Sequence, residues 1–275
     1  MNSLHSIFLG SGRFFFKVRN GLFPTLLILL LVVARPTRFL GHTGLDIYAT
    51  ALGIFLVLAG QTFRLLVIGY AYIRRGGKNR EVFANELVTR GFYAHTRNPM
   101  YLGNFSVVVG LSLVYGSAWG YGLMVPFFAF VYLSITTAEE EYLHGKFGAN
   151  FDEYVRRVNR FIPNLDGIRA SLAEFSYDWR RALIKEYNTL SFILAAMFGI
   201  LAWKITYVYG YAEHKTLIRA LGATWIPLAV FYGTIRYLKK TRRLRPLRRE
   251  ETETDISPAD QDLLKPRGMQ DESSV

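Results

Sequence analysis

The residue types that could carry chemistry in this chain are concentrated in two short segments. Residues 97–103 read Arg-Asn-Pro-Met-Tyr-Leu-Gly, and Glu139, Glu140 and Glu141 follow further along the chain. Arg97 is a permanent cation whose planar set of N–H donors suits a carboxylate or a phosphate. The glutamates can accept hydrogen bonds from hydroxyl or amino groups and can attract a cation. Together the two segments indicate a site for a small ligand that carries both charges.

Neighbouring residues add other groups that such a site needs. Asn98 supplies an amide, and Pro99 suits the first turn of a helix, whose free backbone N–H groups can bind an anion. Gly103 permits close approach of a ligand or of another helix. The aromatic residues that could stack on an adenine or contact a cation are Tyr93, Tyr101 and Tyr154. This combination suits a zwitterionic, partly cationic cofactor.

The elements that position these groups are apolar segments of membrane-spanning length. Hydrophobic residues make up 51% of the 275 positions, and they alternate with short basic stretches. A helix of about 20 apolar residues crosses the roughly 30 Å hydrocarbon layer. The runs that reach or approach this length are 44–73, 101–116, 119–138 and 188–209, with 21–34 and 217–237 as further candidates. We therefore expect an all-α, polytopic transmembrane helical protein with about six spans and short amphipathic helices.

A tight hairpin is expected to bring the two polar segments together. Gly116 and Ser117 separate the runs 101–116 and 119–138. At 1.5 Å per residue each run forms a helix of roughly 27 Å, so the chain returns to the membrane face that it left. We expect residues 97–103 to lie close to the three glutamates. Charged groups at the edge of a membrane are costly and usually functional.

The distribution of charge predicts the orientation in the membrane. The net charge is +12, and the basic stretches are 13–19, 74–97, 146–181 and 236–249. The connections 116–122 and 203–216 contain almost no Lys or Arg. The positive-inside bias therefore favours an integral, multi-pass membrane protein with both termini in the cytoplasm. The basic flanks are expected to attract anionic lipid headgroups, and no nucleic-acid partner is expected.

The composition divides the chain into five expected segments. These are an N-terminal interfacial helix and first membrane segment (1–43), a membrane core with the site (44–165), an amphipathic surface helix (166–187), an additional transmembrane hairpin (188–240) and a basic, then acidic, disordered tail (241–275). The first apolar run lacks a small-residue cleavage site, so no secretory signal peptide is expected. The chain has no cysteine, which excludes disulfides and thiolate ligands, and its five histidines are scattered, so no metal site is expected.

The two polar segments and their flanks resemble a known signature. Residues 91–103 (Gly-Phe-Tyr-Ala-His-Thr-Arg-Asn-Pro-Met-Tyr-Leu-Gly) are similar to the motif of the isoprenylcysteine carboxyl methyltransferase and phospholipid methyltransferase superfamily. A second similarity runs from Glu139-Glu140 through Phe147-Gly148 to Arg160-Phe161-Ile162-Pro163, so the resemblance covers about residues 50–165. It implies an integral membrane methyltransferase with S-adenosylmethionine in a cytoplasmic-side pocket. The lipophilic substrate, a lipid or a lipidated carboxylate or amine, would enter from the bilayer.

The resemblance also implies roles for single residues. The cofactor-binding residues would be Tyr93, His95, Asn98, Tyr101, Gly103, Glu139, Glu140, Tyr154, Arg160 and Pro163, with the last two in a segment that closes a lid. Because a sulfonium methyl group is already activated, catalysis would consist mainly of positioning the nucleophile. Arg97 would hold a carboxylate acceptor or the cofactor carboxylate, and Glu140 or His95 could take a proton from an amine. Arg97 and Glu140 are the expected catalytic residues.

Several alternatives stay open at the level of sequence. Prenylcysteine enzymes typically have His where this chain has Asn98, so the motif is closer to phospholipid N-methyltransferases, and the acceptor can be O, N or S. A nicotinamide-dependent membrane sterol or lipid reductase of related fold is the second candidate. Such reductases usually have Gly and an acidic residue after an Asn-Tyr pair, whereas here Gly103 precedes Asn104. The third is a membrane scaffold that keeps the fold without catalysis.

Overall fold

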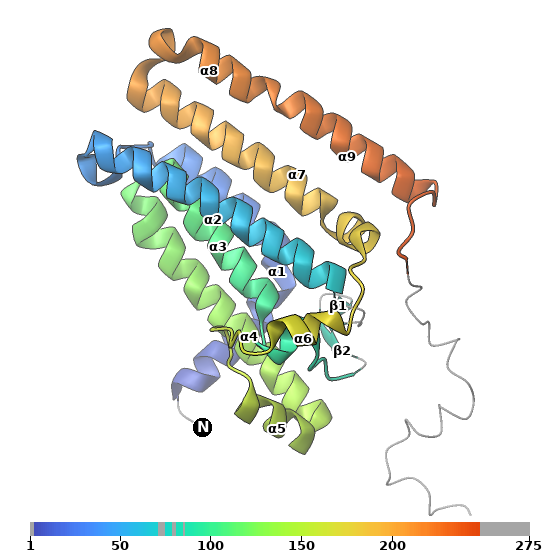
Figure 1. The fold of residues 1–275 in the computed structure, drawn as a ribbon. Coiled ribbons are helices and arrows are strands. Elements are labelled where there is room, and N and C mark those ends of the chain that lie inside the picture. Colours follow the sequence, from blue (N-terminus) through green and yellow to red (C-terminus); the bar gives the residue numbers. More distant parts are fainter. Residues whose placement is uncertain (1–2, 71–74, 79–80, 85, 248–275) are drawn as a thin grey trace, which may run out of the picture.

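The computed structural model describes residues 3–70, 75–78, 81–84 and 86–247, and long helices dominate it (Figure 1). The long helices are α1 (Ser3–Val33), α2 (Thr43–Tyr70), α3 (Pro99–Tyr115), α4 (Val125–Phe147), α7 (Trp179–Lys204), α8 (Tyr211–Ala223) and α9 (Trp225–Lys240). The short elements are α5 (Ala149–Arg157), α6 (Ile168–Ala173), 3-10 turns at Phe39–Gly41 and Gly91–Ala94, and π-helical turns at Gly120–Met124 and Ile205–Gly210. The predicted all-α class is confirmed, with one addition in the described residues. Strands β1 (Arg75–Lys78) and β2 (Glu81–Ala84) form an antiparallel hairpin.

The described helices have the length and composition of a polytopic membrane protein, as predicted. Four stretches are long and apolar enough to cross a bilayer: His5–Val33, Thr43–Tyr70, Gly120–Phe147 and Trp179–Lys240. The last of these turns back at Gly210, which has a φ of 91°, so α7 and the α8–α9 rod run antiparallel (Figure 1). With the shorter apolar helix α3, the described bundle agrees with the expected number of about six spans.

Helix α1 differs from the interfacial segment expected over the first twenty residues. It is one continuous helix of 31 residues that contains Pro24. Its first half packs along α4 through aromatic pairs, with Phe8 and Phe130 rings 5.4 Å apart and Phe15 and Phe127 rings 6.0 Å apart. The apolar run 21–34 therefore reaches spanning length by extending at its N-terminal end. Of its basic side chains, Arg19 is carried into the bundle, whereas Arg13 and Lys17 are exposed.

Helices α2 and α3 cross at two pairs of glycines. A Cβ atom on Gly110 would lie 2.6 Å from the backbone oxygen of Gly53, and a Cβ on Gly60 would lie 2.7 Å from the backbone oxygen of Gly103. Any side chain at these positions would push the helices apart. Since lipid tails are as apolar as leucine, close backbone packing of this kind is what holds helices together in a bilayer.

The turn after α3 is the predicted hairpin. Gly116 adopts a φ of 76°, which ends α3 and favours glycine. Its carbonyl accepts a hydrogen bond of 2.9 Å from the Thr37 hydroxyl. Helix α4 then returns beside α3, so Asn98 and Glu140 meet at one end of the bundle.

Helix α7 begins earlier than expected, and this corrects the boundary between the segments 166–187 and 188–240. The surface helix α6 ends at Ala173, and α7 starts at Trp179. The Asp178 carboxylate caps it by accepting a hydrogen bond of 2.9 Å from the backbone N–H of Arg181. The charged first turns of α7 read as amphipathic in sequence, but Glu186 is buried against other helices.

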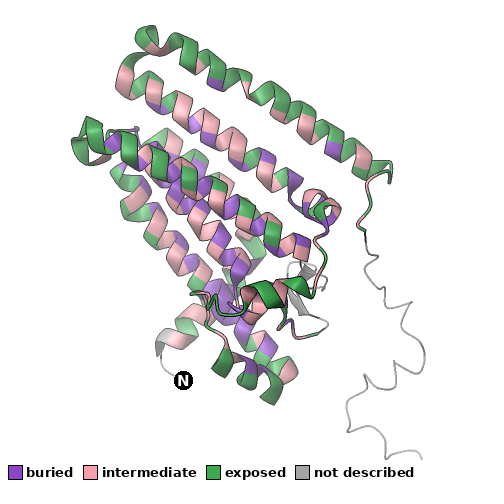
Figure 2. Cartoon of the chain, viewed as in Figure 1, coloured by how far each residue is buried: buried purple, intermediate pink, exposed green. Residues whose placement is uncertain are grey.

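The apolar core lies among α1, α2, α3, α4 and α7. Buried residues concentrate on the facing sides of these helices, while the α8–α9 rod is mostly exposed (Figure 2). Trp225, Ile226 and Val230 are among its exposed apolar side chains. Exposed apolar residues on a spanning helix are compatible with a lipid environment. The fold therefore places a compact five-helix unit around the site.

Candidate functional site

The segment that leads into α3 carries the site. Residues 91–94 form a 3-10 turn that Gly91 enters with a φ of 61°, and α3 begins at Pro99. Asn98 occupies the position that caps α3, yet its side chain makes no capping hydrogen bond. Its amide instead donates to a Glu140 oxygen at 3.4 Å and to the Arg160 carbonyl at 3.2 Å. The Asn98 side chain therefore does not cap α3 but joins it to Glu140 and Arg160.

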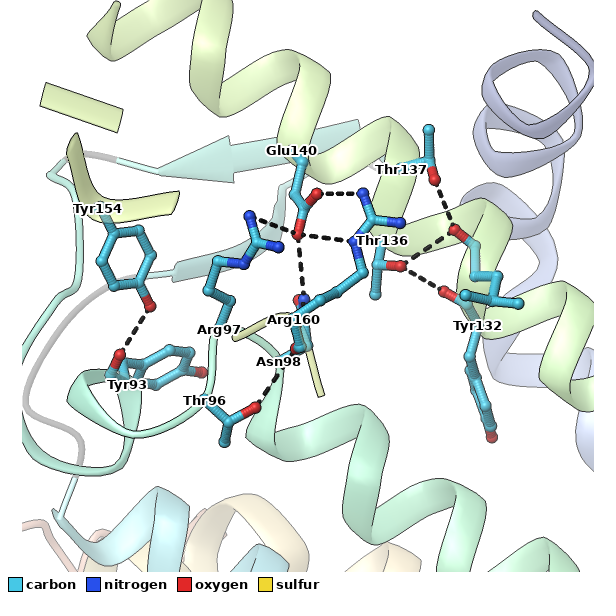
Figure 3. Close-up of polar contacts among 11 residues, drawn as sticks. Tyr93, Thr96, Arg97, Asn98, Tyr132, Thr136, Thr137, Glu140, Tyr154 and Arg160 are labelled. Atoms are coloured by element: carbon cyan, nitrogen blue, oxygen red, sulfur yellow. Dashed lines mark hydrogen bonds and ion pairs between the residues drawn. The ribbon is translucent and has the colours of Figure 1, made fainter. Parts of the chain in front are cut away.

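Glu140 is the centre of a buried charge network (Figure 3). Its Oε1 lies 3.5 Å from a guanidinium nitrogen of Arg97 and 3.3 Å from Nε of Arg160, whose terminal nitrogen also bonds to Oε2. Asn98 donates to the same Oε1. One carboxylate thus joins α4, the start of α3 and the segment after α5. Charge-assisted bonds of this kind are stronger than neutral ones in a buried site.

Arg97 depends on that carboxylate. Burial lowers the pKa of the Arg97 guanidinium below its usual range, Glu140 opposes this decrease, and the neighbouring Arg160 adds to it. The group remains a cation at neutral pH because arginine is not deprotonated in proteins. Its Nε is buried with no hydrogen-bond partner in the described part of the chain. Arg97 therefore has donor capacity left for a ligand.

The segment from Asn159 to Asn164 is attached to the motif by its backbone. The Arg97 N–H donates to the Asn159 carbonyl at 2.9 Å, and the Asn164 N–H donates to the His95 carbonyl at 3.0 Å. The Thr96 hydroxyl donates to the Phe161 carbonyl at 3.0 Å. These hydrogen bonds hold residues 159–164 beside residues 95–97. The segment expected to form a lid is therefore hydrogen-bonded to residues 95–97.

His95 and Tyr154 make further hydrogen bonds that hold residues 93–95 against the segment 159–164 and against α5. The Nδ1 atom of His95 lies 2.6 Å from the Asn164 carbonyl, and its Nε2 atom is buried without a hydrogen-bond partner among the described residues. The Tyr154 hydroxyl on α5 donates to the Tyr93 carbonyl at 2.7 Å (Figure 3). Buried polar atoms are usually satisfied, so an orphaned imidazole nitrogen next to the motif is informative.

Glu139 has a separate set of partners. It accepts a hydrogen bond of 2.8 Å from the Tyr101 hydroxyl and lies 3.5 Å from Arg19 of α1. Arg19 in turn donates to the Tyr101 hydroxyl at 3.1 Å. Glu141, in contrast, is exposed and lies 3.8 Å from His5. The three consecutive glutamates thus separate into two buried roles and one surface position.

A cavity of about 590 Å³ opens beside these groups. Its polar end is lined by Arg19, Asn20, Tyr93, Arg97, Asn98, Tyr101 and Glu139. Its remaining wall is largely apolar and includes Leu22, Phe23, Val107, Val108, Phe128, Val131, Ile135, Phe192 and Ile193. Four helices, α1, α3, α4 and α7, contribute to this wall. The cavity can therefore hold a molecule with a polar head and an apolar body.

The predicted site residues divide between the cavity wall and its support. Those that line the cavity are Tyr93, Arg97, Asn98, Tyr101 and Glu139. Those that support it or lie away from it are His95, Gly103, Glu140, Tyr154, Arg160 and Pro163. Gly103 lies at the crossing with α2, where a Cβ atom would be 2.7 Å from Arg64 Cγ. Pro163 is half-buried in the segment that covers the motif.

Sequence reasoning missed Arg19 and the charged residues of the deeper wall. Arg19 was expected at the membrane surface, but the continuous helix α1 carries it to Glu139. Arg64 and Asn104 also line the cavity, and Arg64 pairs with Glu186 of α7. The signal that could have identified Arg64 is its position as a charged residue inside an apolar run, where such residues are rare and functional.

Comparison with known proteins gives one family and three relatives. Residues 48–150 match the family model described as Phospholipid methyltransferase. The Protein-S-isoprenylcysteine O-methyltransferase of Schizosaccharomyces pombe is 32% identical over 157 residues, which is 56% of this chain and 61% of that protein. No solved structure matches the chain.

Two further relatives match shorter parts of the chain. The Nickel-cobalt-cadmium resistance protein NccN of Alcaligenes xylosoxydans xylosoxydans is 34% identical over 87 residues, 32% of this chain and 40% of that protein. The Cobalt-zinc-cadmium resistance protein CzcN of Cupriavidus metallidurans is 32% identical over 114 residues, 42% of this chain and 47% of that protein. The chain thus covers less than two thirds of each relative. Its described residues contain no group of three or more His, Asp or Glu side chains suited to a metal ion.

Proposed function

We propose that this protein transfers a methyl group from S-adenosylmethionine to a lipophilic acceptor. The proposal is supported by the match of residues 48–150 to the phospholipid methyltransferase family model and by the similarity to a Protein-S-isoprenylcysteine O-methyltransferase. One observation carries the proposal. Residues from the two segments that resemble the methyltransferase signature, 91–103 and 139–163 (the two family-like segments), form the polar end of a cavity whose other walls are largely apolar. A cofactor at the polar end and a lipid in the apolar part would meet inside one space.

The residues present fit this cofactor. The cavity volume of about 590 Å³ lies within the usual range for small-molecule sites, roughly 300–1,000 Å³. Glu139 offers a carboxylate to a cation or to ribose hydroxyls, and Tyr93 and Tyr101 offer aromatic rings. Arg97 offers unused donor capacity for a carboxylate. The bound cofactor would supply a methyl group that is already activated as a sulfonium.

The chain's own contribution is to position the reactants and to exclude water. Glu140 holds Arg97, Arg160 and Asn98 in one place, and the segment above them covers the motif. Arg97 would hold a carboxylate of the cofactor or of the acceptor. For an amine acceptor a proton must leave. Glu140 and the Nε2 of His95, which has no partner among the described residues, lie behind the cavity wall, so the proton would reach either of them through a relay such as one water. Positioning of this kind can account for a large part of the rate.

We place the site at the cytoplasmic face, with both termini on that side. The basic residues that flank the apolar helices support this orientation. The end of the described chain also lies near the site's end of the bundle, because the Leu247 N–H donates to Asp178 at the start of α7. The same basic flanks would bind anionic lipid headgroups.

A binding measurement with one carboxylate removed tests the proposal. Glu140→Gln keeps the shape of the side chain but leaves Arg97 and Arg160 without their shared counter-charge. We expect at least a tenfold loss of affinity for labelled S-adenosylmethionine in the purified protein. The matched control is Glu141→Gln, because the Glu141 carboxylate is exposed. This variant should bind S-adenosylmethionine as tightly as the unaltered chain does.

The same assay separates the competing activities. Binding of reduced nicotinamide cofactor without binding of S-adenosylmethionine would overturn the proposal in favour of the reductase. Equal binding by the Glu140→Gln variant and the unaltered chain would show that the cofactor lies elsewhere. Incubation with labelled cofactor and a total lipid extract would then identify the methylated product.

A further inference from the structure

A second charged group lies in the cavity wall, apart from the two family-like segments. Arg64 of α2 and Glu186 of α7 form a bidentate ion pair, with nitrogen-to-oxygen distances of 2.7 and 2.9 Å. Arg64 is 8% exposed and Glu186 is 4% exposed. Both lie within helices that have the length and composition of membrane spans. Charged residues at such positions are expensive and by default point to a function.

This pair lies deeper in the bundle than the polar end of the cavity. Arg64 hydrogen-bonds to Asn104, which is six residues further along α3 than Asn98 and therefore about 9 Å further into the membrane. Tyr132 lines the cavity seven residues before Glu139 on α4, or about 10 Å deeper by the same rise. The cavity thus has a second group of polar side chains, Arg64, Asn104 and Tyr132, deeper in the bundle than its polar end; we call this group the second level.

The second level presents hydrogen-bond donors to the cavity. Arg64 and Asn104 line it, whereas Glu186 does not and lies behind Arg64. Of the five N–H groups of Arg64, two bond to Glu186 and one bonds to the Asn104 oxygen, which leaves two N–H groups without a bond to the described residues. Because the Asn104 oxygen faces Arg64, its NH₂ group is the part left for a ligand. Asn188 and Thr189 of α7 line the cavity as well.

The charges around the cavity favour an anion. Four arginines outnumber three glutamates in the ion pairs in and around the cavity wall: Arg19, Arg64, Arg97 and Arg160 against Glu139, Glu140 and Glu186. A second buried pair in the chain, Asp46 and Lys204 at 2.6 Å, joins α2 to α7 without lining this cavity. That pair links the same two helices at a place away from the cavity. The Arg64 pair differs from it by facing a space that can hold a ligand.

We propose that Arg64 and Asn104 form a headgroup subsite that binds an oxyanion, a carboxylate or a phosphate, on the lipophilic acceptor. Glu186 is a positioning residue that holds the guanidinium toward the cavity. The inference rests on the proposed function for the identity of the ligand as a methyl acceptor. The subsite itself depends only on the cavity and its donors. It gives α7, which lies outside the segment matched by the family, a part in choosing the acceptor.

The test compares three twelve-carbon probes that differ only in their heads. Dodecanoate carries a carboxylate, dodecyl phosphate carries a phosphate, and dodecanol is uncharged. Their affinities for the purified full chain in detergent are measured by calorimetry, and each variant is compared with the unaltered protein in the same detergent. The double variant Arg64→Met with Glu186→Met removes both charges together, which avoids leaving one of them buried and unpaired.

We expect the double variant to lose at least tenfold in affinity for one or both anionic probes and to bind dodecanol unchanged. Whichever anion loses more identifies the acceptor head as carboxylate or phosphate. The matched control is Asp46→Asn with Lys204→Met, which removes the other buried pair and should keep the preference for anions. An unchanged ratio of anion to alcohol affinity in the Arg64 variant would overturn the subsite, as would an equal loss in the control.

A single substitution keeps the test informative if the double variant does not fold. Asn104→Leu leaves the Arg64–Glu186 pair in place and removes one donor from the cavity wall. We expect a smaller loss in the same direction, and no loss for either anion would again overturn the proposal. Labelled S-adenosylmethionine binding is measured in parallel. Absence of that binding in the unaltered chain would refute the proposed methyl transfer, while a preference for anions that depends on Arg64 would still support the subsite.

Discussion

At the scale of the residue, a single carboxylate organises the site. Glu140 is within bonding distance of Arg97, Arg160 and Asn98, which come from separate parts of the chain. Leaving any of these donors unpaired in a buried setting would cost more than the bond itself contributes. The network is therefore sensitive to the polarity of each member and not only to its size.

Asn98 gives the sharpest test of that polarity. Its amide faces two acceptors, a Glu140 oxygen and the Arg160 carbonyl. Asn98→Asp has the same shape but replaces the donor with an acceptor, so both hydrogen bonds become repulsive. We expect a loss of about 1–3 kcal/mol in the free energy of unfolding and at least a tenfold weaker S-adenosylmethionine affinity. Denaturant unfolding in detergent and cofactor titration measure the two effects.

Asn164→Asp is the matched control for this substitution. Asn164 is exposed, and its side-chain oxygen accepts from the Asp166 N–H at 3.1 Å, a role that an aspartate retains. It should leave stability and binding within experimental error. If both variants behaved alike, the donor role of the Asn98 amide would be wrong.

At the scale of the element, the crossing of α2 and α3 determines where the site can form. The glycine pairs let the two backbones approach closely, and this places Arg64 against Gly103 and Asn104. The contact between α2 and α3 joins residues that lie far apart in the sequence, such as Arg64 and Asn104. The position of the deeper polar level therefore depends on residues that have no polar side chain.

Gly110→Ala tests this crossing. The added methyl group would lie 2.6 Å from the Gly53 carbonyl oxygen and 2.8 Å from a methyl group of Val57, and the backbone atom cannot rotate away. We expect the free energy of unfolding to fall by about 1–3 kcal/mol because the helices must separate. Thermal unfolding in detergent is the measurement.

Gly145→Ala provides the comparison on α4. This glycine is helical and exposed, and nothing lies within 4 Å of an added Cβ atom. Since alanine has the better helix propensity, stability should stay the same or rise by up to about 1 kcal/mol. A similar loss at both positions would mean that helix crossing is not the cause.

At the scale of the whole molecule, α7 ties the C-terminal hairpin to the five-helix unit at two levels. Near the site it carries Glu186, and at its other end Lys204 bonds to Asp46 at 2.6 Å and to Thr50 at 2.9 Å. Tyr209 adds a hydrogen bond of 2.7 Å to the same aspartate. These buried polar contacts specify how α7 is rotated against α2.

Lys204→Met is expected to be strongly destabilising. It leaves Asp46 buried without its cation, which costs about 3–5 kcal/mol. The double variant with Asp46→Asn should recover most of that loss, because the asparagine oxygen can still accept from the Phe39 N–H and its NH₂ group can donate to the Tyr209 hydroxyl. The four proteins of this cycle are compared by thermal unfolding. A double variant as unstable as the single one would contradict a direct ion pair.

The orientation of the whole molecule can be tested with single thiols, since the chain has no cysteine. Ala173→Cys lies at the end of α6 near the site, and Thr216→Cys lies on α8 beyond the turn at Gly210; both positions are exposed. We expect an impermeant maleimide to label residue 216 in intact cells and residue 173 only after permeabilisation. The reverse pattern would place the site outside the cell.

The sequence alone determined the membrane character, the succession of helices and the meeting of the two polar segments. Span length and the turn at Gly116 are local properties, and the constant rise of a helix converts them into position. For this reason the sequence predicts that residues 97–103 and the three glutamates at 139–141 lie close together. The resemblance of residues 91–103 to a methyltransferase motif likewise depends on consecutive residues.

The tertiary structure alone decided how the side chains are distributed. Which of three adjacent glutamates faces Arg97, which faces Arg19, and which faces water depends on the rotation of α4 against its neighbours. The pairing of Arg64 with Glu186 joins residues more than a hundred positions apart. Helix rotation and long-range pairing follow from packing over the entire bundle, and no local pattern in the chain encodes them.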